Sequence, residues 1–317
     1  MLPVHSPPNL YRGCALSAET NGSGAPSDLA LRVVALFVIL VGSTLGALFP
    51  VIGAYGCRAL PRGCLDAARY LGSGVIIGTG FIHLLAPGIE ALGSPCLAPA
   101  WRKYPYALGL CLASILAIFV LEIATVRGAA AHLAKSAAQR SPSYDTPLQA
   151  DDDTAGDNTA RIVGVAVLEF GAVIHSVLIG LTLAADRKFK VLFAVLVVHQ
   201  VFEGLGIGAR LASAAGLSAR VRVGGAVVFG LSTPVGMAVG LAMRTAYSAD
   251  APGALVVSGV LDSLGAGVLI YTALVELLGR EILFNEELMK GPARKLAAAL
   301  GWVFLGCVVM ALLGKWV

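Results

Sequence analysis

The sequence predicts an all-α integral membrane protein with eight transmembrane helices in a bundle. Of its 317 residues, 57% are hydrophobic and only 13% are charged, with a mean hydropathy of +0.82. Soluble domains are typically about 25% charged. The apolar residues also fall into runs of the roughly 20 residues that a helix needs to cross a bilayer. We therefore expect lipid as the surrounding medium. The net charge of +4 is spread over the loops, and nothing indicates a nucleic-acid partner.

The first part of the chain contains a tail and three helices. Residues 1–28 are rich in Pro, Ser and Gly and lack the basic start and short apolar core of a signal peptide, which predicts a disordered extracytoplasmic tail. Residues 29–126 should form transmembrane helices at 29–56, 67–92 and 105–126. Pro50 and Pro87 are expected to kink the first two, because proline removes a backbone donor and clashes with the preceding turn.

A long polar break divides the chain. Residues 127–161 carry Asp151–Asp153 and show no apolar periodicity, which predicts a flexible cytoplasmic loop. The remaining residues, 162–317, should contain five more helices, with Pro234 kinking the sixth span. Those helices are expected at 162–184, 190–211, 221–244, 254–279 and 294–316.

The basic residues predict the orientation. Most of the 23 Lys and Arg residues lie in connections that are cytoplasmic if the amino terminus is outside, and cytoplasmic loops are enriched in these residues. We expect both termini to be extracellular in the plasma membrane, with an intracellular vesicle membrane as the alternative. The glycosylation sequon at Asn21 agrees with this orientation. Cys14 and Cys96 would then both lie outside the cell, where a disulfide between them is one of the pairings that the sequence leaves open.

The span at 190–211 contains three polar residues that are unusual for a membrane helix. His199, Gln200 and Glu203 share one broad helix face, since Glu203 lies four residues after His199 and three after Gln200. Polar groups in hydrocarbon are costly and indicate a functional site by default, although a hydrogen-bond network between helices is the alternative. The glycines that follow leave room for a close neighbour: Gly204, Gly206 and Gly208.

The preceding span supplies further polar residues. HSVLIGLTL, which begins with His175 and Ser176, aligns with HQVFEGLGI as a weak repeat. In antiparallel helices such a repeat would give inverted helix pairs about a pseudo-two-fold axis in the membrane plane. Imidazole and carboxylate bind zinc and other first-row divalent metals. We therefore predict a metal site of His175, His199 and Glu203.

Three more residues are weaker candidates for this site. Ser176 and Gln200 adjoin the predicted ligands and offer only neutral oxygens. His83, alone in the span at 67–92, fits a metal ligand and a helix-packing hydrogen bonder equally well.

HSVLIGLTL followed by HQVFEGLGIG resembles the paired fourth- and fifth-helix signature of the ZIP (zinc- and iron-regulated, Zrt/Irt-like) metal transporters, especially their plant and fungal branch. TGFIHLLAPG, FGLSTPVGMAVG and GVLIYTALVELL also resemble family segments, so the similarity covers about residues 30–316. The resemblance implies eight helices, both termini outside, and a primary metal site on His175, His199 and Glu203. Other branches have acidic or amide ligands where this chain has Ser176 and Gln200, and a glutamate where it has Ile179, so we expect one main site.

The expected function is import of Zn²⁺ or Fe²⁺ toward the cytosol. The metal is the transported substrate, no prosthetic group is expected, and a homodimer is compatible with the sequence. The alternative is a membrane-embedded metalloenzyme, a hydrolase or oxidase that keeps its metal. The sequence lacks the HExxH helix and the paired ExxH helices with partner carboxylates that such enzymes use.

The orientation can be tested on intact cells. An epitope tag inserted in residues 1–28 should bind an impermeant antibody without permeabilisation, because the positive-inside bias places the tail outside. A tag in the predicted loop at 127–161 should bind only after permeabilisation. The reverse pattern would contradict the orientation.

Overall fold

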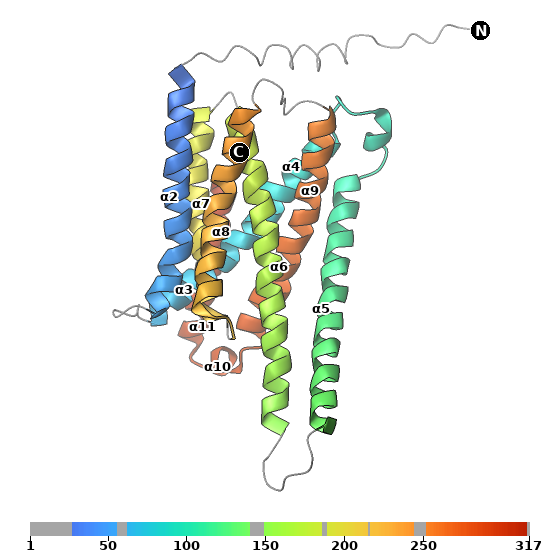
Figure 1. Cartoon of the computed structure of the whole chain (residues 1–317), viewed down its shortest axis with the longest axis vertical. Coiled ribbons are helices and arrows are strands. Elements are labelled where there is room, and N and C mark those ends of the chain that lie inside the picture. Colours follow the sequence, from blue (N-terminus) through green and yellow to red (C-terminus); the bar gives the residue numbers. More distant parts are fainter. Residues whose placement is uncertain are drawn as a thin grey trace, which may run out of the picture.

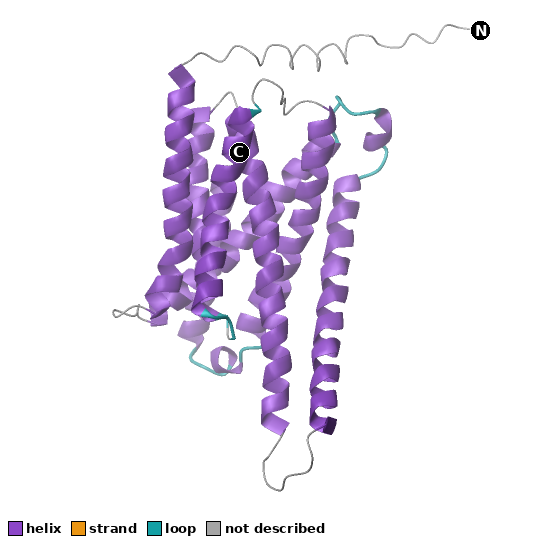
Figure 2. Ribbon diagram, in the orientation of Figure 1, coloured by secondary structure: helices purple, strands orange, loops and turns teal. Residues whose placement is uncertain are grey.

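The computed structural model describes residues 27–55, 62–139, 149–185, 189–214, 216–243 and 252–315. These residues form helices joined by short turns, and none of them is in a strand (Figure 2). Eight of their helices are long and apolar enough to cross a membrane. In lipid a backbone must satisfy its own hydrogen bonds, which helices do. The predicted class, an all-α integral membrane protein with eight spans, is confirmed.

The first three spans begin with α2 (Ser27–Tyr55). The second span is composite: α3 (Arg62–Gly78), the π-helical segment η2 (Thr79–Leu85) and α4 (Ala86–Leu92). A short 3₁₀ turn, η3 (Pro99–Arg102), leads into α5 (Tyr106–Gln139).

The other five spans follow with short connections. They are α6 (Gln149–Ala185), α7 (Phe189–Ser213), α8 (Ala219–Ala242), α9 (Pro252–Tyr271) continued by the π-helical η4 (Thr272–Leu283), and α11 (Ala293–Leu313) after the single turn α10 (Glu286–Met289). The start of α2 and the end of α11 lie at one end of the bundle, here called the terminal end (Figure 1). The opposite end, where α5 ends and α6 begins, is called the loop end.

The structure differs from the predicted loop at 127–161. α5 continues to Gln139 and α6 already begins at Gln149, so helix covers most of this interval. Residues 129–139 are rich in alanine, the strongest helix former, and acidic residues such as those of Asp151–Asp153 are generally favourable near the start of a helix. The polar composition of residues 127–161 therefore shows where the apolar spans end, but the helices themselves continue beyond that point. Residues 140–148 and 1–26 lie outside the described residues, and their predicted disorder stays a prediction.

The spans pack as two groups. α2, α6, α7 and α8 pack on one another and form the first group; α3 with η2 and α4, α5, α9 with η4, and α11 form the second. The main contacts between the groups are made by α7 with α3 and by α6 with α5 and α9. Large apolar side chains such as Phe37, Leu112 and Phe304 point outward, as expected for surfaces that face lipid.

Glycines let α7 approach a helix of each group. A Cβ on Gly208 would collide with the backbone carbonyl of Ala47 in α2, and a Cβ on Gly206 would lie 2.8 Å from the Cα of Gly72 in α3. The predicted close neighbours of these glycines are thus α2 and α3. As a result, the polar residues of α7 lie at the boundary between the two groups.

The contact of α7 with α2 predicts a matched pair of stability effects. Gly208→Ala should lower the free energy of unfolding by about 1–3 kcal/mol, the usual cost of overpacking. Gly224→Ala in α8 is the control, because its new Cβ would meet nothing within 4 Å. Thermal unfolding of the purified variants in detergent gives the comparison. Equal melting temperatures for Gly208→Ala and the wild type would contradict the close approach of α2 and α7.

Candidate metal centre

Three predicted ligands meet between α6 and α7. His175 of α6 and His199 and Glu203 of α7 each offer a ligand atom, and these atoms all lie within 4.8 Å of one another. Their exposed fractions are 2%, 0% and 1%. Among the residues that the structure describes, this is the one group of three or more His, Cys, Asp or Glu residues with such spacing. The predicted combination of His175, His199 and Glu203 is therefore present as a compact, buried cluster.

Both imidazole rings and one carboxylate oxygen of this cluster make no hydrogen bond within the part of the chain that the structure describes. His199 Nε2 lies 3.3 Å from Glu203 Oε2, but the two groups are not oriented as a hydrogen bond, so this contact satisfies neither atom. Both ring nitrogens of His175 and of His199 are buried without a hydrogen-bond partner. Buried polar atoms are normally paired, because leaving them unpaired costs free energy. An arrangement of this kind fits a bound cation.

Ser176 and Gln200 adjoin the cluster and contact each other. Both are fully buried, and Gln200 Nε2 donates a long hydrogen bond of 3.5 Å to Ser176 Oγ. Gln200 Oε1 has no hydrogen-bond partner among the described residues, so this neutral oxygen is available to a cation. Ile179 lies one turn after His175 on α6 and packs in an apolar cluster with Leu183 and Leu196. No acidic side chain therefore extends the site at this position of α6.

His83 approaches the cluster from the second group of helices. Its ring lies edge-on to that of His199, with centroids 4.8 Å apart, and its Nε2 lies 3.0 Å from the carbonyl oxygen of Met310 in α11. A carbonyl only accepts hydrogen bonds, so Nε2 must carry the proton and Nδ1 keeps a lone pair. Nδ1 is buried and has no hydrogen-bond partner among the residues that the structure describes. His83 thus makes the packing contact and still has a free ligand atom.

The position of His83 depends on a local change of helix type. Pro87, four residues later, has no N–H to donate to the His83 carbonyl. The helix widens into the π-helical η2 here, and the Ala86 N–H bonds to the carbonyl of Phe81, five residues earlier. π-helical turns occur frequently at functional sites. The proline thus disturbs this span next to the cluster, whereas Pro50 and Pro234 lie within continuous α-helices.

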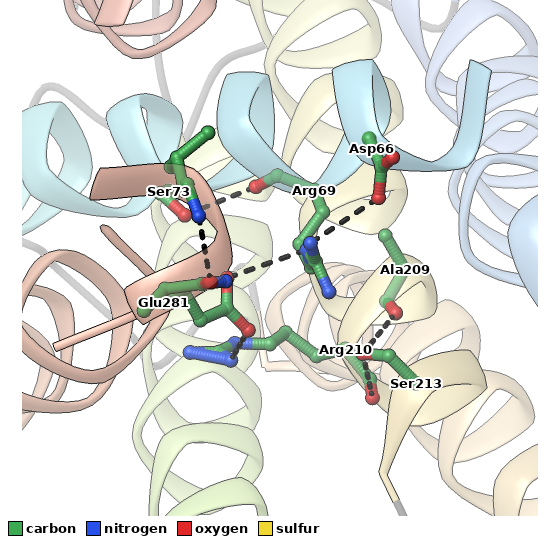
Figure 3. Close-up of polar contacts among 9 residues, drawn as sticks. Asp66, Arg69, Ser73, Ala209, Arg210, Ser213 and Glu281 are labelled. Atoms are coloured by element: carbon green, nitrogen blue, oxygen red, sulfur yellow. Dashed lines mark hydrogen bonds and ion pairs between the residues drawn. The ribbon is translucent and has the colours of Figure 1, made fainter. Parts of the chain in front are cut away.

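Two groups of charged residues near the loop end were not predicted. Glu281 of η4 lies between Arg210 of α7 and Arg69 of α3 (Figure 3). The sequence contained one signal: Arg210 follows Glu203 by seven residues and so shares its helix face. Separately, Glu122 of α5 accepts hydrogen bonds from Tyr271 and Arg280.

Cys96, near the terminal end, is disulfide-bonded. Cys14 lies outside the described residues, so its predicted pairing with Cys96 stays a prediction.

Comparison with known proteins shows to which family the chain belongs. The sequence profile of the ZIP zinc transporter family matches residues 29–153 and 126–314. The chain is 34% identical to zinc-regulated transporter 1 of Saccharomyces cerevisiae, over 98% of this chain and 94% of the relative. It is 33% identical to zinc transporter 9 of Oryza sativa, over 96% and 93%. It is 34% identical to Fe(2+) transport protein 1 of Arabidopsis thaliana, over 91% and 86%. The chain therefore belongs to the ZIP zinc transporter family.

Proposed function

We propose that the protein imports Zn²⁺ or Fe²⁺ toward the cytosol through the cluster of His175, His199 and Glu203. The observation that carries this proposal is the set of buried ring nitrogens and carboxylate oxygen without hydrogen-bond partners. Imidazole and carboxylate suit zinc and ferrous iron alike. The names of the relatives, which describe zinc and Fe(2+) transport, support the same substrates. These relatives are named as transporters, and no observation favours the metalloenzyme alternative.

The location of the cluster suggests how transport proceeds. The ion would exchange hydration water for His175, His199 and Glu203, all on the first group of helices. His83, on the second group, would add a further nitrogen while the groups are in contact. Movement of one group against the other would then expose the site to each side in turn, as in other transporters with sites near the midplane. A ligand contributed across the boundary would be lost during this movement, which favours release of the ion.

The weaker residues have secondary roles in this proposal. Gln200 and Ser176 would adjust the site with neutral oxygens, which bind weakly and suit a site that must also release its ion. One group of ligands among the described residues supports one main metal site. We further propose that the loop end faces the cytosol and that both termini are extracellular in the plasma membrane. The apolar outer surface is compatible with a homodimer.

Replacing the carboxylate of the cluster provides the direct test. Glu203→Ala should reduce uptake of ⁶⁵Zn²⁺ and ⁵⁵Fe²⁺ into proteoliposomes by at least about tenfold, the lower end of the loss seen when even an outer-shell partner of a metal site is removed. Glu90→Gln is the control, because Glu90 is an exposed carboxylate of α4 outside the cluster. Undiminished uptake by a folded, membrane-inserted Glu203→Ala protein would contradict the proposed function.

A further inference from the structure

A second charged cluster lies on the same face of α7 as the metal centre. Arg210 follows Glu203 by seven residues, which is two helical turns and about 10 Å along the helix axis toward the loop end. An ion that leaves the metal centre along this face of α7 must therefore pass Arg210. The residues around Arg210 therefore lie beside the next part of such a path.

Glu281 connects the two groups of helices at this level. Arg210 Nη1 of α7 donates to Glu281 Oε1 at 2.6 Å, and the other carboxylate oxygen lies 3.5 Å from Arg69 Nε of α3 (Figure 3). Arg69 also pairs with Asp66, one turn earlier on α3. The side chains of Arg210 and Glu281 are only 11% and 15% exposed. Because α7 belongs to the first group and η4 to the second, the Arg210–Glu281 bond joins the two groups.

A direct backbone contact lies between the metal centre and these charges. Gly206 is three residues beyond Glu203 and four before Arg210, and a Cβ on it would lie 2.8 Å from the Cα of Gly72 in α3. Gly72 is in turn three residues beyond Arg69. The two glycines therefore bring α3 and α7 into contact between the two polar layers. No ion can pass between these two backbones in this conformation.

We propose that Arg69, Arg210 and Glu281 form a gate that closes the metal path toward the loop end. The inference rests on the metal path proposed above. While the gate is closed, Glu281 neutralises two guanidinium groups that would otherwise repel a divalent cation. Separation of α7 from α3 breaks the Arg210–Glu281 bond and opens the Gly72–Gly206 contact together. Glu281 then offers the departing ion a carboxylate that Arg210 no longer occupies.

A purely structural ion pair would behave differently, and the chain contains a matched example. Arg280 Nη2 donates to Glu122 Oε1 at 2.6 Å, the same length as the Arg210–Glu281 bond, and both pairs are partly buried. Both partners of this control pair belong to the second group of helices. Loss of the control pair should lower stability without opening a path between the groups.

The test uses a reporter cysteine at the gate. Ser73 is adjacent to Gly72, is 2% exposed, and differs from cysteine by one atom. In Ser73→Cys protein, purified in nanodiscs without added metal, the rate of modification by a charged methanethiosulfonate reagent measures opening. Protein that retains Ser73 gives the background from the native cysteines. Arg210→Gln and Glu281→Gln should each raise the rate by at least about threefold, as expected for the loss of a partly exposed ion pair.

Two controls distinguish a gate from a purely structural ion pair. Arg210→Lys should keep the rate near that of the Ser73→Cys parent, and Glu122→Gln should leave it unchanged. The gate would be overturned if the modification rates of Arg210→Gln and Glu281→Gln equalled that of the parent. It would also be overturned if Glu122→Gln raised the modification rate as much as these two variants do. These rates are measured without metal, so failure of the gate is distinguishable from failure of transport, which the uptake assay reports separately.

Discussion

The arrangement of this protein depends on keeping two histidines and a glutamate together in an apolar interior, with few hydrogen bonds to their polar atoms. His175, His199 and Glu203 are almost completely buried, and the ligand atoms they direct at one another lack hydrogen-bond partners among the described residues. Such groups are costly unless a cation occupies the space between them. The helices around them therefore have to hold the cluster open for an ion while excluding other polar partners. α7 meets this requirement because glycines let the backbones of α2 and α3 approach it closely without adding polar side chains.

α7 carries two residues of the metal centre and also makes contacts that would break if the two groups of helices moved apart. One face of this helix carries Glu203, then the contact of Gly206 with α3, and then Arg210. Across the boundary, the second group of helices offers His83 and Glu281, each from a π-helical segment. Both sets of cross-boundary contacts must break when the groups move apart. The ion would thus lose a ligand at the centre at the same time as the path toward the loop end opens.

Much of the fold and the central ligands could be predicted from the sequence because both follow from short-range patterns. The apolar runs located all eight spans, and the spacing of His199 and Glu203 placed them on one face. The polar interval 127–161 was misread because composition reports where a helix leaves the membrane, and alanine-rich segments continue the helix beyond that point. The role of Glu281 could not be predicted, since its partners are distant in sequence. Pairing of Glu281 with Arg69 and Arg210 exists only once three helices have packed.

The central claim is that a divalent metal is held by imidazole and carboxylate inside the bundle. X-ray absorption at the zinc edge of purified protein loaded with Zn²⁺ tests this claim most directly. The account predicts about one zinc per chain with a first shell of nitrogen and oxygen at roughly 2.0–2.2 Å, including scattering from two or three imidazoles. A His175→Ala/His199→Ala protein should lose this shell. A spectrum of the wild type without imidazole scattering, or with sulfur ligands, would contradict the account.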